Sequence, residues 1–294
     1  MNKIKLHSSI PFWCFNQLSY FLVRCLSSIQ PGIKQINWFA AIYAVFKALE
    51  VRNHMSNIQH FRKNIGCEES NLTFLTKYFI RRSSDAMLGR LLCESPEYYF
   101  SCIEIKGEEH VQKLTGLDRG VLVLGSHGGP VMLRSFLFWE KFGIPLGSFA
   151  SKKSYIRNQN RQPLLARDRL LKSMPFYSAG QEKKLLQGIL GGEWVNMLID
   201  YKLNSQHPVN CYIAGRHAAL SEFPFRISLK YNIPILFTGI IRSQNSDKVL
   251  VNIQPLTDFN NPTEGLGLYV KNLEVLVKKD PYSNNTIPEW TGDG

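Results

Sequence analysis

The sequence predicts an α/β fold, in which a single domain carries a central mixed sheet flanked by helices, and an apolar helical extension precedes it. Short apolar runs such as GVLVLGS (120–126) are typical of buried strands, and they alternate with segments of helical spacing. The 294 residues, 44% of them hydrophobic, provide a core for one such domain. We find no internal repeat or low-complexity linker, and we divide the chain into residues 1–50 (extension) and 51–294 (α/β domain).

The elements of the predicted domain follow one another in an alternating order. Helical spacing predicts helices over 68–92, from Val131 onward, and over 181–190, 219–231 (broken at Pro224) and 264–279. Apolar runs predict strands in the second half of 94–107 and over 120–126, 193–200, 232–242 and 248–256. Such an order is typical of sheets with helices on both faces.

The first 50 residues contain two apolar, aromatic segments, 10–26 and 36–50, with basic residues nearby and no Asp or Glu before Glu50. This composition is typical of helices that lie in a membrane interface, although two ordinary core helices are the alternative. Residues 10–26 are interrupted by polar side chains and fall short of the roughly 20 apolar residues of a spanning helix. No clear cleavage site follows them, which argues against a secretory signal.

The chain is basic, with a net charge of +12, and residues 151–184 are especially rich in Lys and Arg. Such a field attracts anionic lipid, an acidic protein or nucleic acid. Few aromatic side chains accompany the basic ones, so nucleic acid ranks last among these partners. The six cysteines are scattered without metal-site spacing, which predicts free thiols, a reducing compartment and no bound metal.

His127 stands where a buried strand turns into a helix, in the segment LGSHGGP. Open α/β sheets bind ligands at the carboxyl ends of their strands. Gly128 and Gly129 allow a sharp turn and a close approach of substrate. Asp200 ends another predicted strand, which places a carboxylate at the same edge of the sheet. A hydrogen-bonded core histidine is the alternative interpretation.

Several segments resemble the bacterial lipid A late acyltransferases, the lauroyl and myristoyl transferases. The similar segments are IEIKGEEHVQKLTGLDRGVLVLGSHGG (103–129), GGEWVNMLID (191–200), CYIAGRHAALSEFPFRISLKYNIPILFTGIIR (211–242) and VRNHMSNIQH (51–60). Each motif alone is weak, but their order and spacing are specific. The resemblance covers residues 50 to 280.

The resemblance implies an acyltransferase of lipid A biosynthesis that needs no metal or cofactor. Such enzymes sit on the cytoplasmic face of the inner membrane and move an acyl group from an acyl-carrier-protein thioester to a lipid A hydroxyl. Their signature is a His followed after four residues by Asp or Glu. The His removes the hydroxyl proton, and the acid orients the imidazole.

This sequence keeps the histidine but has Met132 at the position of the acid. Methionine cannot orient an imidazole. Asp200 and Glu222 are the candidate replacements, and we prefer both to Glu140, which lies farther along the predicted helix. The alternative is that each is an ordinary salt-bridged or solvated acid.

On the substrate side, the resemblance implies an arginine near the active site, and Arg169 has the matching spacing before Asp200. Arginine binds phosphate in a bidentate manner, so we assign Arg167 and Arg169 to the lipid A phosphates. Lys152 and Lys153 are assigned to the carrier protein or the lipid headgroups. The remaining substrate-binding candidates are Gly128, Gly129, Gly215 and Arg216.

Two further functions stay open at this point. A divergent branch, exemplified by the Vibrio enzyme that attaches glycine to lipid A, takes an aminoacyl group from a carrier protein and confers resistance to cationic antimicrobial peptides. Its donor carries an ammonium group, which an extra acid such as Glu222 would suit. The other alternative is a non-catalytic, lipid-binding relative, which Met132 alone supports.

Overall fold

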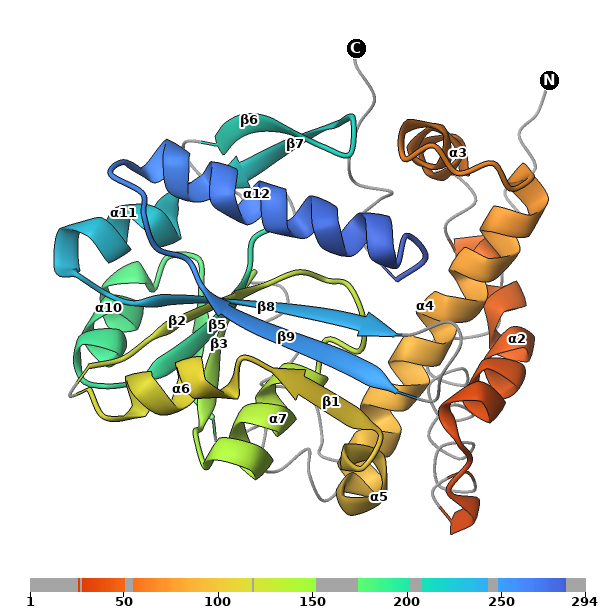
Figure 1. Cartoon of the computed structure of the whole chain (residues 1–294), viewed down its shortest axis with the longest axis horizontal. Coiled ribbons are helices and arrows are strands. Elements are labelled where there is room, and N and C mark those ends of the chain that lie inside the picture. Colours follow the sequence, from red (N-terminus) through yellow and green to blue (C-terminus); the bar gives the residue numbers. More distant parts are fainter. Residues whose placement is uncertain are drawn as a thin grey trace.

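A seven-stranded mixed sheet forms the centre of the protein (Figure 1). The structure is a computed structural model that describes residues 26, 28–50, 55–117, 119–151, 174–200, 208–242 and 248–283. The strand order is β1-β9-β8-β2-β5-β3-β4. Its members are β1 (Ile103–Lys106), β2 (Leu122–Gly125), β3 (Leu146–Ala150), β4 (Phe176–Ser178), β5 (Trp194–Leu198), β8 (Ile235–Arg242) and β9 (Val249–Pro255).

Five neighbouring strands, from β8 to β4, are parallel, whereas β9 runs antiparallel to β8 and pairs in parallel with β1. The parallel part brings the carboxyl ends of β8, β2 and β5 to one edge of the sheet. A separate antiparallel hairpin consists of β6 (Pro208–Ile213) and β7 (Arg216–Ser221). These pairings confirm the predicted mixed sheet and place the ends of β2 and β5 side by side.

Helices cover both faces of the sheet (Figure 1). Two, α6 (Glu108–Thr115) and α7 (Leu133–Phe142), lie on one face, and α10 (Glu182–Leu190), α11 (Phe223–Tyr231) and α12 (Pro262–Lys279) lie on the other. The remaining described helices are α2 (Ile33–Glu50), α3 (Met55–Asn64), α4 (Asn71–Glu94) and the short α5 (Pro96–Phe100).

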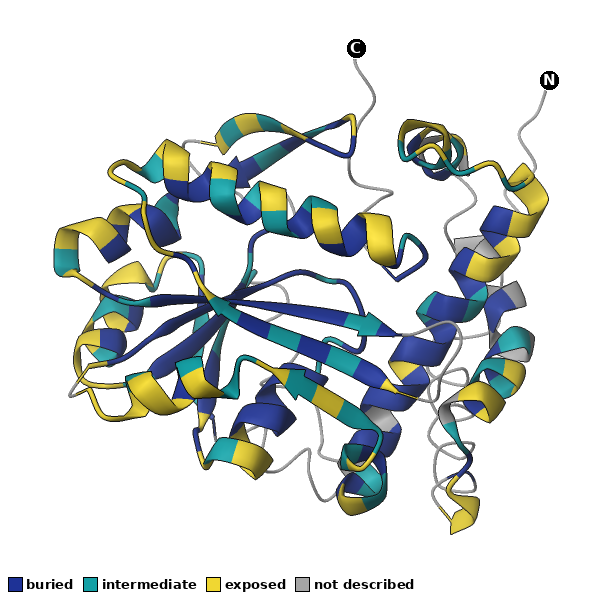
Figure 2. Ribbon diagram, in the orientation of Figure 1, coloured by how far each residue is buried: buried dark blue, intermediate teal, exposed yellow. Residues whose placement is uncertain are grey.

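The core consists of two hydrophobic clusters, one on each face of the sheet. Strand β2 is buried on both faces, so Leu122 and Leu124 enter one cluster while Val121 and Val123 enter the other. This explains why the strand reads as an unbroken apolar run. Figure 2 shows buried strands between helices whose outer sides are exposed.

Helix α4 joins the two clusters at the edge of the sheet. Phe74 and Tyr78, in its first half, belong to one cluster, and Leu88 and Leu91, in its second half, belong to the other. Ser70 caps the start of the helix, because its hydroxyl accepts a hydrogen bond from the Thr73 amide (3.1 Å). Because α4 crosses this edge, its buried polar residues lie close to the ends of the strands.

The N-terminal extension is described from Leu26 onward, so the segment 10–26 lies almost entirely outside the described residues. The predicted second segment, 36–50, lies within α2, which packs against α4 through Ile36 and Ala40. On the outer side of α2, the Trp38 side chain is 71% exposed. Among the described residues, no helix combines the length and hydrophobicity needed to cross a membrane.

One sequence prediction is wrong in its details. The sequence predicts one helix over residues 219–231, broken at Pro224, but the structure ends β7 at Ser221 and begins α11 at Phe223. Pro224 lies in the first turn of α11, where proline is well tolerated because its missing amide hydrogen would have no partner there. The proline therefore helps to start the helix and does not break it.

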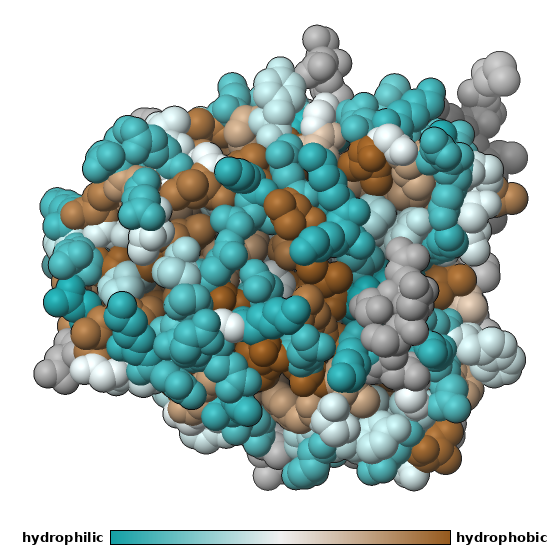
Figure 3. All heavy atoms as spheres, in the orientation of Figure 1, coloured by the Kyte–Doolittle hydropathy of each residue, from teal (hydrophilic) through white to brown (hydrophobic). Residues whose placement is uncertain are grey.

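The surface over α11 and α12 is mixed in character (Figure 3). Hydrophilic side chains cover most of the face in view, and hydrophobic ones show between them. Leu229 of α11 and Val275 of α12 are among the exposed apolar residues. This pattern agrees with helices that turn one face to the sheet and the other to the surroundings.

Candidate active site

His127 lies in the short connection between the carboxyl end of β2 and the start of α7. The connection spans residues 126–132, and we call its first five residues, Ser126-His127-Gly128-Gly129-Pro130, the histidine loop. The Ser126 hydroxyl accepts a hydrogen bond from the Gly128 amide (3.2 Å), which tightens the turn. Gly129 has a φ of +71°, and a Cβ there would come within 2.7 Å of the Ile240 side chain. The loop therefore requires glycine at this position.

Asp200 meets His127 because their strands are neighbours in register. Gly125 of β2 pairs with Leu198 of β5. His127 lies two positions beyond Gly125, and Asp200 lies two positions beyond Leu198. Asp200 Oδ1 lies 2.7 Å from His127 Nδ1, and Asp200 Oδ2 accepts a hydrogen bond from the His127 backbone amide (2.8 Å). One carboxylate thus holds both the ring and the backbone of the histidine.

The two side chains differ in their exposure. The Asp200 side chain is completely buried, whereas 32% of the His127 side chain is exposed. When Nδ1 carries the proton and donates a hydrogen bond to Asp200, the lone pair of the neutral ring is on Nε2. The arrangement therefore holds the ring by its buried edge, as an orienting acid does in a hydrolase triad.

A buried cation, Arg134, lies on the same side of the sheet as Asp200. It belongs to the first turn of α7, and its Nε donates to the Thr238 hydroxyl (2.9 Å). Its guanidinium occupies the space next to Gly125, where a Cβ would come within 2.4 Å of Nε. Burial lowers the pKa of Arg134 to about 10, against the opposing charge of Asp200. At neutral pH the side chain remains charged, and its field favours the ionised form of nearby carboxyl groups.

From the opposite face, Tyr269 of α12 holds the end of β2. Its hydroxyl donates to the Gly125 carbonyl (2.8 Å), and the side chain is fully buried. Burial, together with the charge of Asp200, raises the pKa of Tyr269 well above 10, so the hydroxyl keeps its proton. The sequence analysis did not identify Arg134 or Tyr269, because each lies within a helix and only the packing of that helix on the sheet shows that its polar side chain is buried.

Glu222 is also buried, but its partners are elsewhere. Its two carboxylate oxygens accept a hydrogen bond from the Thr263 hydroxyl (2.6 Å) and pair with Arg226 (3.2 Å). It precedes the first residue of α11, so the negative charge lies at the helix N-terminus. Asp200 therefore contacts His127, whereas Glu222 contacts residues at the junction of α11 and α12.

Met132 lies at the start of α7, and its Cβ faces α4. A Cβ on Gly89 of α4 would come within 3.9 Å of the Met132 Cβ. Glu140, the third acid considered, is exposed on α7. The position of the expected acid is thus part of a helix contact.

The remaining predicted substrate residues have different outcomes. Gly215 has a φ of +72° and forms the turn of the β6–β7 hairpin, where its carbonyl accepts from Asn64 (3.0 Å). Arg216 follows it and is 1% exposed. Arg167, Arg169, Lys152 and Lys153 lie outside the described residues. Within the described ranges, no cluster of three His, Cys, Asp or Glu side chains suits a metal ion.

A protein-family model matches most of the α/β domain. The family model described as "Bacterial lipid A biosynthesis acyltransferase" matches residues 85–279, about two thirds of the chain. No curated protein matches the sequence. The matched region contains His127, Asp200, Arg134 and Tyr269.

Proposed function

The chain belongs to the bacterial lipid A biosynthesis acyltransferases, and on this premise we propose that His127 is the general base of an acyl transfer to a hydroxyl of lipid A, with Asp200 as its orienting acid. The observation that carries this proposal is the double contact of Asp200 with the ring and the backbone amide of His127. In this proposal Asp200, two residues beyond the end of β5, takes the place of the acid that the sequence lacks at Met132.

The proposed reaction has two proton transfers. Nε2 of His127 takes the proton of the acceptor hydroxyl while the hydroxyl oxygen attacks the acyl carbonyl of a thioester. The tetrahedral intermediate then expels the thiolate, which takes the proton back from the imidazolium. The ester and the free thiol are the products, and the histidine returns to its neutral form.

Asp200 and Arg134 prepare the histidine for this step. The buried carboxylate fixes the tautomer and stabilises the imidazolium that forms in the transition state. The Arg134 cation balances the charge of Asp200 in a region without exposure to solvent. Such fixed charges need little reorganisation during the reaction.

The donor we propose is an acyl carrier protein, with no cofactor bound to the enzyme itself. Carrier proteins are acidic, and the basic stretch 151–184 would attract such a partner. In this arrangement Arg167 and Arg169 contact the lipid A phosphates, and Lys152 and Lys153 contact the carrier protein or headgroups. For a glycyl donor, the ammonium would need an acid, but Asp200 and Glu222 are both engaged with other partners.

The place of action we propose is the cytoplasmic face of the inner membrane. Support comes from the apolar, acid-free N-terminus and from two exposed apolar side chains near it, Ile29 and Trp38. Trp is favoured at the boundary between lipid and water. An extension of this kind lies on the membrane and brings the domain close to its lipid substrate.

Mass spectrometry of lipid A tests the function directly. Cells that express the protein should carry lipid A with an added fatty-acyl mass, and cells that express His127→Ala should lack that mass at equal protein levels. An added glycyl mass would show that the donor carries a glycyl group and would contradict the proposed fatty-acyl donor. Unchanged lipid A with the wild-type protein, or normal modification with His127→Ala, would contradict it.

A further inference from the structure

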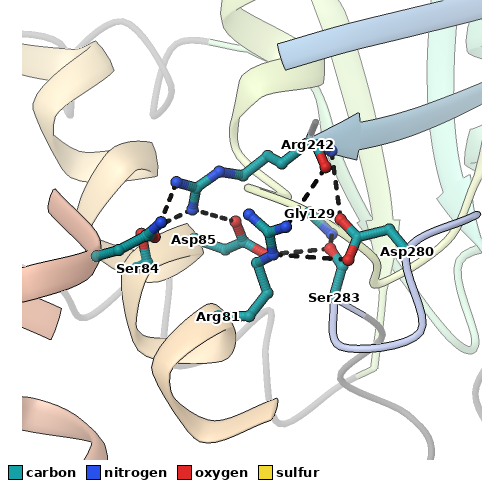
Figure 4. A network of polar contacts seen from close by, with 8 residues as sticks. Arg81, Ser84, Asp85, Gly129, Arg242, Asp280 and Ser283 are labelled. Carbon is teal, nitrogen blue, oxygen red and sulfur yellow. Dashed lines mark hydrogen bonds and ion pairs between the residues drawn. The ribbon is translucent and has the colours of Figure 1, made fainter. Parts of the chain in front are cut away.

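A buried network of charged residues lies beside the histidine loop (Figure 4). Arg242, at the end of β8, pairs with Asp85 of α4 (3.0 Å), and Arg81 of α4 pairs with Asp280 after α12 (3.5 Å). The Arg242 amide also donates to Asp280 (3.3 Å). All four side chains are less than a tenth exposed. The two cations and two carboxylates balance, which a buried cluster of this kind needs.

A serine joins this network to the histidine loop. The Gly129 amide donates to the Ser283 hydroxyl (2.6 Å), and that hydroxyl donates to Asp85 Oδ2 (3.0 Å). The other oxygen of Asp85 accepts from Arg242. Ser283 is 3% exposed, and it comes from the segment after α12, 154 residues away from Gly129 in the sequence. Figure 4 shows Ser283 close to Gly129, with Asp85 on the α4 side of the network.

This chain of hydrogen bonds restricts the backbone two residues beyond His127. On one side, Gly129 packs so closely on Ile240 that no Cβ would fit. Toward Ser283, its amide is held by a hydroxyl that itself donates to a charged carboxylate, which is a strong type of hydrogen bond. Removal of the hydroxyl would leave a buried amide and a buried carboxylate oxygen each without this partner, which favours a shift of the loop.

We propose that Ser283 is a positioning residue, which holds the histidine loop through Gly129 so that His127 meets the acceptor hydroxyl in the reactive geometry. Asp85 and Arg242 in turn hold Ser283. The inference rests on the proposed role of His127, because it assigns Ser283 no contact with substrate. The segment after α12 thereby becomes part of the catalytic architecture, although the histidine lies in the first half of the chain.

Kinetics of Ser283→Ala in the full-length protein test this role. We expect kcat to fall by about 10- to 100-fold, the size of effect that a misplaced catalytic group produces, while KM for lipid A changes little. Hydrogen exchange of a peptide that spans 126–132 should become faster, because the Gly129 amide loses its acceptor. Ser283→Thr keeps a hydroxyl and should restore most of the lost kcat.

Ser228→Ala is the matched control. Ser228 is also buried, and its hydroxyl donates to the Ile233 carbonyl (2.7 Å) in the connection that leads from α11 to the start of β8. Ser228→Ala removes the same chemical group at the opposite edge of the sheet, where β8 begins. The substitution should therefore reduce stability without a comparable loss of kcat. If Ser283→Ala does not fold, Ser283→Cys keeps the volume but has a weak hydrogen-bonding thiol, and it should show the same fall in kcat.

The outcomes separate this inference from the function on which it rests. A normal kcat for Ser283→Ala or Ser283→Cys, or a fall in kcat without faster exchange in 126–132, would overturn the positioning role. An equal fall in kcat for Ser228→Ala would also overturn it, since stability alone would then explain the loss. Normal transfer by His127→Ala would instead refute the proposed function.

Discussion

Replacement of Asp200 by asparagine tests the central geometric claim about the site. The substitution keeps the size of the side chain but turns one of its two acceptor atoms into a donor. Asp200 now accepts from the His127 backbone amide and contacts Nδ1. In asparagine, an oxygen toward Nδ1 places the NH₂ group against the backbone N–H, so that two donors face each other. The opposite orientation donates to Nδ1 and leaves the proton on Nε2, which then cannot act as a base.

Both orientations therefore damage the base, and the expected loss is that of a triad acid. We expect kcat to fall on the order of 10⁴-fold, as for the equivalent substitution in a serine protease. Such a fall corresponds to about 5 kcal/mol of lost transition-state stabilisation. The protein should still fold, because the amide fills the same buried space, although Arg134 loses its compensating charge.

The assay follows the transfer of a labelled acyl group from an acyl carrier protein to lipid A, with kcat and KM measured separately. Glu222→Gln is the matched control, because it neutralises another buried carboxylate whose partners are Thr263 and Arg226. The control should retain nearly normal kcat. A nearly normal kcat for Asp200→Asn would refute the orienting role, and a large loss for Glu222→Gln in that case would transfer the role to Glu222.

Three further predictions concern the helix position, the charged network and the extension. Met132→Glu should not rescue Asp200→Asn in the acyl-transfer assay, because the Cβ of residue 132 faces α4. Restored turnover in the double variant would contradict this prediction. Burial and the charge of Asp85 raise the pKa of Asp280 from 3.8 to about 6. The folded state thus keeps a proton that the unfolded state has lost, so this group's contribution to stability falls as pH rises from about 4 to 6. Asp280→Asn should remove that part of the pH dependence in urea unfolding, and an unchanged dependence would refute it. Deletion of residues 1–30 should release the protein from membranes at high salt in a sedimentation assay, since only screened charge would remain; continued sedimentation would place the anchor elsewhere.

The strands that the sequence predicts correctly are those buried on both faces or strongly alternating. LVLG in β2 and ILFTGIIR in β8 have apolar side chains for both clusters, and such runs need no knowledge of the partner strands. The short strands β3 and β4 contain small and polar residues, and their pairing is what makes them strands. In β7 the run AALS suits either a helix or a strand. Its pairing with β6 decides the matter, and that pairing is a tertiary contact.

The residues of the site also differ in whether the sequence predicts them. The carboxyl-edge rule places His127 and Asp200 together once both are read as strand ends. The preference for Asp200 over Glu222 depends on the β2–β5 register, which no local pattern contains. The buried position of Arg134 is not predicted, for a different reason. A charged residue in an amphipathic helix is expected to face solvent, and its partner Thr238 lies 104 residues away in the sequence.

Position 132 carries no acid, and other residues hold the histidine loop. An acid on α7 would reach the ring from the helix that follows the loop, whereas Asp200 contacts it from just beyond the central strand β5 and also accepts a hydrogen bond from the His127 amide. With Gly129 held by Ser283, the histidine loop is fixed on both sides of Gly128, by residues from two other segments of the chain. A side chain at position 132 then has no orienting task, and an apolar residue can serve the contact with Gly89. Methionine at this position is therefore compatible with the proposed mechanism, because Asp200 makes the contact with His127 that the mechanism requires.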